Sequence, residues 1–353
     1  MKIKYYDISE DINKYNNAWC FIVVGGRSTG KTYSALKYCY EHHHKFVFIK
    51  RTIDDVKLLC GGVKSEYAID LSPFKPINRD IGSNVKAILI SDKGIGAFYK
   101  FSGEDKGELV GYILALNAVT KFKGFDMSDA DFIIFDEFIP QPWERINRKE
   151  GEQLLDLYKT VARDREQRGK KPLKLLCLAN ATSISNPTTN ILEVTDIIAD
   201  MGINNTDILY IENRGILLHI IESDDSFLSI EKQSGIYKAM EGTAWARVSF
   251  DNDFAYDDMT NIGHMSLKNF VPRYALMYKQ MIIYVYQKSD MYYLTESRSN
   301  RVKIYNLNRE TEQRLYFNEE YQDLYEACIN DKVVFDKYSM YDLIINYKKC
   351  FKI

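Results

Sequence analysis

The sequence predicts an α/β protein in which a parallel sheet with helices precedes a smaller α+β domain. Two observations carry this prediction. Short, continuous apolar runs recur through the first 180 residues with helical patterns between several of them, which is typical of strands buried on both faces of a parallel sheet. After about residue 200 the composition shifts toward tyrosine and β-branched residues in short strand-like runs, which indicates a second domain.

Length and composition narrow the class of protein. The 353 residues have room for about two domains. With 46% hydrophobic and 27% charged residues, the chain is neither disordered nor collagen-like. The formal net charge of −2 excludes a wholly basic coat for nucleic acid but allows a local basic face. No apolar run reaches about 18 residues and no signal peptide opens the chain, so we expect a soluble intracellular protein.

The N-terminal region predicts a βαβ unit. Residues 19–24, WCFIVV, form a short apolar run followed at once by glycines, as expected for a buried parallel strand. Residues 31–41 have the apolar spacing of a helix, and 46–49 form a second apolar strand. Strand, glycine-rich turn, helix and strand in this order make up the unit.

The following region predicts further strands and a helix. Residues 85–116 contain three strand-like runs separated by Gly/Asp turns, which predict an antiparallel meander joined to the parallel sheet. Residues 131–138, DFIIFDEF, form another buried strand with acids at its end. An amphipathic helix is predicted over 154–169, and 173–180 is one more buried strand.

The domain boundary follows from the shift in composition. Helical patterns return at 319–329 and 338–350, after the tyrosine-rich strand-like runs. We therefore expect a first domain over 1–205, a connecting segment over 206–250 and a C-terminal domain over 251–353.

One motif indicates phosphate binding. The pattern GxxxxGK[ST] of a P-loop (Walker A) is formed by Gly25, Gly26, Arg27, Ser28, Thr29, Gly30, Lys31 and Thr32. Its backbone N–H groups and the helix dipole would cradle phosphate, Lys31 would reach the β- and γ-phosphates, and Thr32 would ligate Mg²⁺. The alternative is a glycine turn before an ordinary helix, but a strand before the motif and a helix after it favour the P-loop.

The strand that ends in acids is the expected partner of this loop, as a Walker B strand. Asp136 would join the Mg²⁺ shell, and Glu137 would orient and deprotonate the attacking water. The alternative is a strand with a solvated acidic end. The adjacent acids favour ATP hydrolysis over a nucleotide kinase, and no NKxD-type guanine reader is present, which favours ATP over GTP.

Four more polar residues are candidates for contacts with the bound nucleotide. Asn180 ends an apolar strand and is predicted to sense the γ-phosphate, or else to cap the next turn. Arg163 and Arg165 lie toward the end of the amphipathic helix, where either could be supplied to a neighbouring subunit's site or belong to a solvated face. Arg27, inside the loop, would contact the γ-phosphate or brace the loop.

A basic stripe indicates a polyanionic partner. Residues 143–174 carry ten basic and six acidic side chains, against a net charge of −2 for the whole chain. Such a stripe beside an ATPase site suits a phosphate backbone read without sequence specificity. A solvated loop is an equally good interpretation.

Together these motifs resemble the encapsidation (DNA-packaging) ATPases of the small phi29-like tailed phages. The matching strings, in order, are GGRSTGKT, FVFIKR, AFYKFSGEDKGELVGYILAL, IIFDEF, TVARDRE, CLANATSISNP and GTAWARVSFDNDF. The resemblance covers 15–190 well and extends in patches to 254. Beyond that, only a general strand pattern matches.

The resemblance implies an additional-strand (ASCE) P-loop ATPase domain, followed by an RNase H-like domain that lacks nuclease activity. Such proteins form a homopentameric ring at the portal vertex of the empty capsid and drive double-stranded DNA inside. Arg163 matches the family's trans-acting finger, and either Lys121 or Lys123 would be a second trans-acting cation. Family members that use a packaging RNA bind it through the C-terminal region.

We therefore predict an ATP- and Mg²⁺-dependent motor that translocates viral double-stranded DNA, working with the capsid portal (connector) protein in the host cytoplasm at the portal vertex. One alternative is a terminase-like ATPase with an active C-terminal nuclease, whose carboxylates would be Asp251, Asp253, Asp257 and Asp258. The other is a nucleotide-gated assembly module with negligible hydrolysis.

Overall fold

The computed structural model describes residues 5–61, 71–122, 124–141, 143–144, 147–165, 167–221, 229, 232–243, 257–299 and 302–353. The described residues group into two compact units. The first unit falls within 1–192 and 204–256, and the second within 193–203 and 257–353. Each unit has a sheet of its own.

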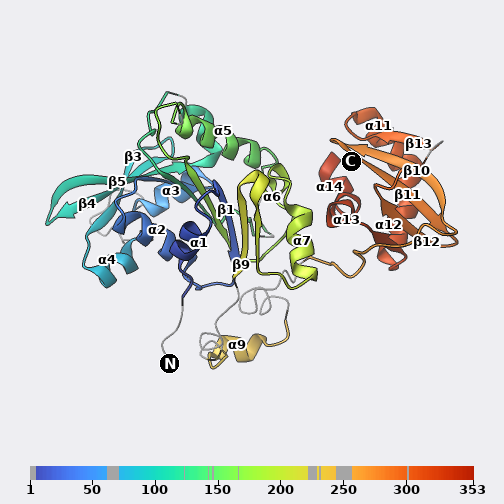
Figure 1. Ribbon diagram of the computed structural model, residues 1–353, viewed down its shortest axis with the longest axis horizontal. Helices are drawn as coiled ribbons and strands as arrows, with labels where there is room; N and C mark the ends of the chain where they lie inside the picture. The colour runs from blue at the N-terminus through green and yellow to red at the C-terminus, as the bar shows by residue number, and fades with distance from the viewer. Residues whose placement is uncertain are drawn as a thin grey trace. The chain divides into compact units, whose positions relative to one another are not determined.

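The first unit is built on a nine-stranded sheet with helices packed against it (Figure 1). Its strand order is β3-β4-β5-β2-β6-β7-β1-β9-β8. The strands are β1 (Cys20–Gly25), β2 (Phe46–Lys50), β3 (Val85–Ser91), β4 (Ile95–Ser102), β5 (Asp105–Ala115), β6 (Phe132–Asp136), β7 (Lys174–Ala179), β8 (Ile208–Ile211) and β9 (Ile216–Ile221). Strands β2, β6, β7 and β1 are mutually parallel and almost wholly buried, so the predicted apolar runs are confirmed as strands.

The helices of the first unit are α1 (Ile8–Lys14), α2 (Lys31–Glu41), α3 (Ile53–Leu59), α4 (Lys75–Ile81), α5 (Glu150–Ala162), α6 (Pro187–Ile191) and α9 (Gly235–Met240), with 3-10 turns η1 (Leu116–Phe122) and η2 (Glu212–Arg214). The predicted meander over 85–116 is confirmed as β3-β4-β5, and β5 joins it in parallel to β2. The helix predicted over 154–169 is α5, which ends at Ala162 because Arg163 adopts a positive φ of 41°.

The parallel strands align their carboxyl ends at one edge of the sheet. Val24 on β1 is level with Ala179 on β7, and Asp136 on β6 is level with Leu178. On the other side, Ile49 of β2 pairs with Phe135. The loops that follow these four strands therefore meet at the same edge, where ligand sites form in α/β sheets. Strand β7 lies between β1 and β6.

The connecting segment expected over 206–250 contains two strands of the first sheet. β9 pairs in parallel with β1, and β8 pairs antiparallel with β9 at the sheet edge. The shift in composition after about residue 200 suggested a boundary, but the apolar run ILLHII supplies the strand that covers one edge of β1. Conversely, α7 (Thr195–Ile203), expected in the first domain, packs in the second unit, where Asp196 accepts two hydrogen bonds from Ser339.

The second unit has a five-stranded sheet in the order β13-β10-β11-β12-β14. Strands β10 (Val271–Tyr278), β11 (Met281–Lys288) and β12 (Met291–Thr295) form an antiparallel meander, while β13 (Lys303–Asn306) and β14 (Val333–Phe335) add in parallel at its two sides. The other helices are α11 (Glu310–Tyr316), the π-helical turn η3 (Phe317–Tyr321), α12 (Gln322–Ile329), α13 (Tyr338–Ile345) and α14 (Tyr347–Phe351).

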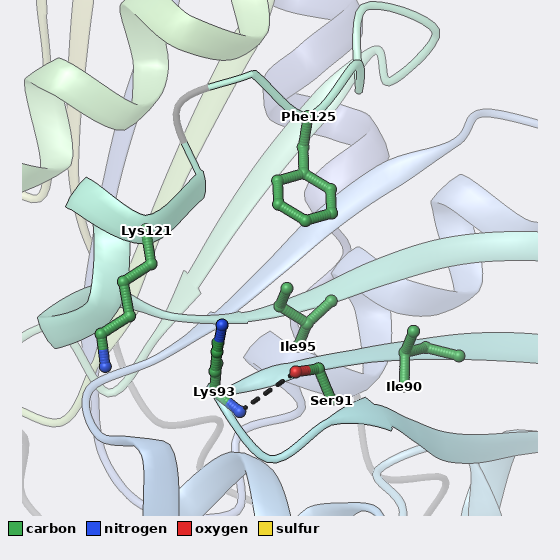
Figure 2. A pocket seen from close by; sticks show the side chains of 6 residues that line it. All are labelled: Ile90, Ser91, Lys93, Ile95, Lys121 and Phe125. Atoms are coloured by element: carbon green, nitrogen blue, oxygen red, sulfur yellow. Dashed lines mark hydrogen bonds between the residues drawn. The ribbon is translucent and has the colours of Figure 1, made fainter.

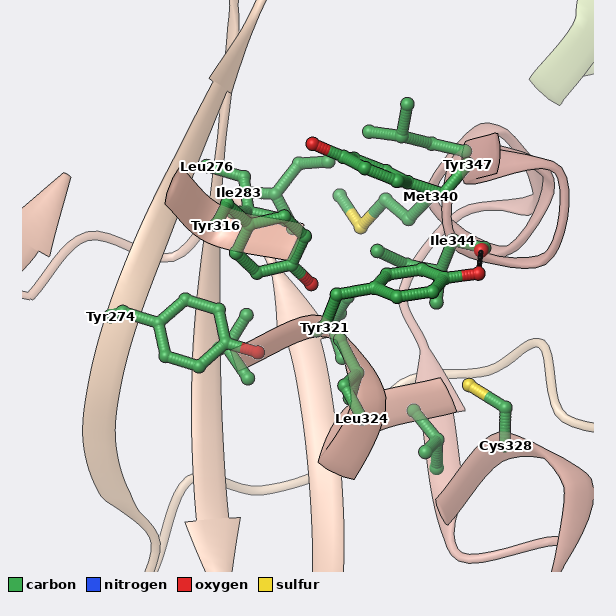
Figure 3. Close-up of a cluster of buried hydrophobic side chains, with 14 of the residues drawn as sticks. Tyr274, Leu276, Ile283, Tyr316, Tyr321, Leu324, Cys328, Met340, Ile344 and Tyr347 are labelled. Carbon is green, nitrogen blue, oxygen red and sulfur yellow. Dashed lines mark hydrogen bonds between the residues drawn. The ribbon is translucent and has the colours of Figure 1, made fainter. Parts of the chain in front are cut away.

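Tyrosines fill the core of the second unit. Tyr274, Tyr316, Tyr321 and Tyr347 lie between the strands and the helices, with Leu276 beside them (Figure 3). Their rings meet edge-on or tilted, with centroids 4.8 to 6.1 Å apart, which is the favourable geometry for aromatic pairs.

Candidate nucleotide site

The loop between β1 and α2 has the backbone of a phosphate cradle. Gly30 adopts φ 92° and Ser28 φ 60°, so the chain turns sharply before the helix begins. A Cβ at Gly30 would be strained and would lie 3.3 Å from Cβ of Tyr5, which explains the glycine. The backbone N–H groups of Arg27 to Thr32 donate no hydrogen bond to another described residue outside the helix. They are thus available to an anion.

Lys31 is folded into this loop. Its Nζ donates to the carbonyl oxygens of Gly25 at 3.1 Å and Gly26 at 2.6 Å and to Oγ1 of Thr29 at 3.0 Å. Only 8% of the residue is exposed. Burial lowers its pKa to about 8, although the carboxylate of Asp136 opposes this. A phosphate at the loop would supply the negative charge that this buried ammonium lacks.

Thr32 and Asp136 provide the oxygen atoms that Mg²⁺ prefers. Oγ1 of Thr32 donates to Oδ1 of Asp136 at 2.6 Å, so the first turn of α2 and the end of β6 are in direct contact. A hydroxyl and a carboxylate in contact beside a phosphate loop are hard oxygen ligands, and the described residues here fit the group implied by the motif.

Sequence reasoning did not single out two cations at the end of β2. Lys50 donates to Oδ2 of Asp136 at 2.9 Å and to Oε2 of Glu137 at 3.5 Å. Burial lowers the pKa of Lys50, but these two carboxylates more than offset it, and the net pKa is raised. Polar residues that directly follow a buried parallel strand, as in FVFIKR, were the signal that could have found it.

Arg51, the second of these cations, holds the backbone beyond β6. It donates to the carbonyl oxygens of Glu137 at 2.9 Å and Phe138 at 3.1 Å. Its other nitrogens pair with Glu144 and with Glu150, which is 2% exposed at the start of α5. Burial raises the pKa of Glu150, and the charge of Arg51 opposes the shift.

Glu137 is aimed differently from Asp136. Its backbone adopts φ 57°, which turns the chain out of the strand, and its side chain is 63% exposed. Asn180, at the end of β7, lies with Oδ1 3.5 Å from Nζ of Lys31. The structure therefore brings Lys31, Thr32, Asp136, Glu137 and Asn180 together at one sheet edge, whereas the exposed Arg27 forms no described hydrogen bond there.

The two arginines after α5 have different roles. Arg165 is 4% exposed and donates to the backbone oxygens of Ala130 and Lys171 and to the carboxylate of Asp131. It is a structural residue, so the prediction that it belongs to a solvated face or reaches another subunit is wrong. Arg163 is exposed and is held by the carbonyl of Phe125, with Asp126 at 3.7 Å.

The other predicted cations lie apart from the loop. Lys121 stands in η1 and lines an open pocket of about 510 Å³ with Phe125, Lys93 and Ile95 (Figure 2). Lys123 lies outside the described residues.

Most described cations of the basic stripe, residues 143–174, are exposed, namely Arg148, Lys149, Lys159, Arg163, Arg168, Lys170 and Lys171. Lys174 instead donates to the backbone oxygens of Asn16 and Ala18.

The carboxylates proposed for a nuclease do not converge in the described region. Asp257 accepts a hydrogen bond from Tyr338 at 2.5 Å and Asp258 one from the backbone of Thr260 at 3.0 Å. Asp251 and Asp253 lie outside the described residues. Within the described part of the chain, no group of three or more His, Cys, Asp or Glu side chains could hold a metal ion. In that same part, no helix has the length and apolarity needed to cross a membrane.

Two curated relatives are DNA packaging proteins of Bacillus phages. That of phage phi29 is 25% identical over 248 residues, which cover 68% of this chain and 63% of that protein. That of phage PZA is 25% identical over 243 residues, which cover 67% and 62%. The chain thus matches less than two thirds of the length of these relatives.

Two solved structures share the fold over nearly the whole chain. The bacteriophage Phi-29 viral genome packaging motor assembly has a TM-score of 0.62 at 18% identity, covering 99% of this chain and 98% of that one. The Phi-28 gp11 DNA packaging motor has a TM-score of 0.60 at 16% identity, covering 100% and 99%. The model of the podovirus DNA encapsidation protein (Gp16) family matches residues 1–336, and the chain therefore belongs to that family.

Proposed function

We propose that this protein is an ATP-driven motor that translocates double-stranded viral DNA into a preformed capsid. One observation carries the proposal: the phosphate loop, the Asp136–Glu137 pair and Asn180 converge at one edge of a parallel sheet in a chain of the DNA encapsidation family. The relatives named DNA packaging proteins support the same function.

Each residue at this edge has a role in hydrolysis. The loop amides and Lys31 bind the phosphates, and Lys31 exchanges its contacts with loop carbonyls for the β- and γ-phosphate oxygens. Thr32 and Asp136 hold Mg²⁺, which neutralises charge on the phosphate oxygens when bound. Glu137, turned away from the metal ligands, orients water and accepts its proton, and Asn180 contacts the γ-phosphate.

Arg163 serves the site of another subunit. Helix α5 begins at Glu150, next to Arg51 at the carboxyl edge of the sheet, and its 13 residues span about 20 Å. It ends where Arg165 reaches Ala130, just before the amino end of β6. Arg163 therefore lies at the opposite end of α5 from the contact between Glu150 and Arg51. This supports a trans-acting finger in a homo-oligomeric ring, for which we propose a pentamer.

The strand order of each unit supports the fold class that we propose for it. Strand β7 between β1 and β6 supports an additional-strand (ASCE) ATPase, because it separates the loop strand from the acidic strand. For the second unit, the meander β10-β11-β12 with β13 parallel to β10 supports an RNase H-like class. We propose that this unit has no nuclease activity.

The partners are a phosphate backbone and the capsid. The exposed cations between Arg148 and Lys171 would contact DNA without reading its sequence, so DNA stimulation of ATP turnover should fall steeply with salt. We propose that the ring docks on the portal protein at the portal vertex of the procapsid in the host cytoplasm. A packaging RNA, where one is used, would bind the second unit.

Complementation between two inactive variants tests the motor. ATP turnover is measured at high protein concentration with and without double-stranded DNA for the unchanged chain, Glu137→Gln and Arg163→Ala. We expect DNA-stimulated turnover, its loss in each variant, and partial recovery on mixing, because mixed rings contain sites with an intact glutamate beside an intact arginine. Turnover indifferent to DNA and to Arg163 would refute the translocase and favour a nucleotide-gated assembly module.

A further inference from the structure

The segment before β1 is fastened to the phosphate loop. The backbone N–H of Tyr6 donates to the carbonyl oxygen of Thr29 at 3.0 Å. Two residues on, the N–H of Ile8 donates to Oγ of Ser34 on α2 at 2.8 Å, in a buried contact. The chain from Tyr6 to Ile8 therefore has a fixed position relative to the loop and to the first turns of α2.

A buried polar cluster holds the same segment from behind. The hydroxyl of Tyr6 donates to Oδ2 of Asp11 at 2.7 Å, and Nδ1 of His219 on β9 lies 2.7 Å from the same oxygen. Asp11 is 5% exposed, and the rings of Tyr6 and His219 meet edge-on at 5.5 Å. The side chain and the backbone of Tyr6 are therefore both held by contacts within the protein. Because Tyr5 directly precedes Tyr6, its backbone is held close to the phosphate loop.

Tyr5 is the aromatic side chain at the surface of the loop. Its Cβ, Cδ1 and Cγ lie 3.3, 3.5 and 3.7 Å from where a Cβ of Gly30 would stand, so its ring begins directly against the glycine that opens α2. Yet Tyr5 is 53% exposed. Among the described residues it forms no hydrogen bond or ring contact that would account for an aromatic group here.

We propose that Tyr5 stacks on the nucleobase of the nucleoside triphosphate whose phosphates occupy the loop. The inference rests on the proposed function, because it extends the same site from phosphate to base. The loop amides, Lys31 and Thr32 contact only phosphate and metal and give no hold on the base. An exposed aromatic face offers stacking to any nucleobase, so this subsite favours nucleotides over bare polyphosphate without selecting adenine.

The test compares two probes on the full chain by titration calorimetry with Mg²⁺. Tyr5→Ala should weaken ATP binding about tenfold, as loss of one base–aromatic stack does, and leave inorganic tripolyphosphate binding unchanged. Tyr5→Phe keeps the ring and should bind ATP as the unchanged chain does. Tyr5→Leu keeps an apolar side chain against Gly30 but has no aromatic face, so it should behave like Tyr5→Ala.

Each other outcome has a definite reading. Equal weakening of ATP and tripolyphosphate would overturn the proposal, because Tyr5 would then brace the loop rather than hold a base. Unchanged ATP binding in Tyr5→Ala would overturn it as well. If the unchanged chain binds neither probe, the proposed nucleotide site itself fails, which is distinguishable from a failure of the stack alone.

A spectroscopic readout checks the contact directly. In Tyr5→Trp, saturating ATP should quench or shift the fluorescence of the new indole, and saturating tripolyphosphate should not. Quenching of equal size with both ligands would show that the loop moves without base contact and would contradict the stack.

Discussion

The two sheets of this protein have polar side chains in opposite arrangements. In the first unit, Lys31, Lys50, Asp136 and Glu137 come from three different strands or loops and meet at one edge, where several have contacts that a ligand could replace. In the second unit, Asp336 is already satisfied by the hydroxyls of Tyr293 and Thr295 at 2.8 Å each.

The two units therefore differ in where their charged side chains lie and in whether these side chains are clustered. The first unit concentrates charge at strand ends, which is what phosphoryl transfer requires. The second unit encloses tyrosines, and its described carboxylates Asp257 and Asp336 are held by hydrogen bonds from neighbouring side chains. The following experiments challenge this division, beginning with the largest expected effect.

Removal of Arg163 should abolish turnover without harming the fold. Because an arginine finger contributes about 10³-fold or more to turnover, Arg163→Ala should lower DNA-stimulated ATP turnover by at least that factor. The side chain is exposed, so thermal unfolding should change little. Arg79→Ala is the matched control, since Arg79 is an exposed arginine outside the basic stripe and pairs with its neighbour Asp80. Comparable losses in both variants would contradict a specific finger.

Removal of Arg165 should mainly lower the stability of the first unit. Arg165→Ala leaves the carbonyls of Ala130 and Lys171 and the carboxylate of Asp131 without their buried partner. Breaking a buried ion pair from one side costs about 3 kcal/mol, so urea denaturation of the first unit should shift accordingly. If stability were unchanged while turnover vanished, Arg165 rather than Arg163 would be the candidate finger.

The pH dependence of ATP binding should report on Lys31. The pKa of Lys31 in the folded protein is about 8, below the ordinary value of 10.5. The buried charge therefore lowers the free energy of unfolding below pH 8. This loss is recovered as the pH rises from about 8 to 10.5, because the folded protein releases the proton before the unfolded chain does. Phosphate binding needs the ammonium, so ATP affinity should fall above pH 8 by up to about tenfold per pH unit. Lys31→Met should bind weakly at all pH values and lack this step. An identical step in Lys31→Met would assign the titration to another group.

Much of the candidate nucleotide site could be predicted from the sequence because its residues follow buried strands directly. The phosphate loop, Asp136, Glu137 and Asn180 all stand at strand ends, where parallel packing makes neighbours of residues far apart in the chain. Lys50 follows the same rule and could have been found by applying it to β2.

Other features depended on tertiary contacts that local pattern does not encode. Arg165 is buried because it binds the carbonyl of Ala130, which lies 35 residues away in the chain. The sequence around Arg165 does not distinguish a solvated helix face from a buried turn. Strand β9 could not be assigned to the first sheet from local pattern, because its partner β1 lies about 200 residues earlier in the chain. The expected boundary at 205 differs from the observed division because β8 and β9 join the first sheet, whereas α7 packs in the second unit.

The smallest expected effect is the sharpest challenge to the division between the two units. Incubation of the full chain with plasmid DNA and Mg²⁺ or Mn²⁺ should give no nicking, and Asp257→Asn and Asp258→Asn should leave DNA-stimulated ATP turnover unchanged. A two-metal nuclease needs carboxylates that converge on ions about 4 Å apart, whereas Asp257 and Asp258 are bound to Tyr338 and to the backbone of Thr260. Metal-dependent nicking that is lost in Asp257→Asn but retained in Glu137→Gln would place a second catalytic centre in the tyrosine-rich unit, and chemistry would then no longer be confined to the first sheet.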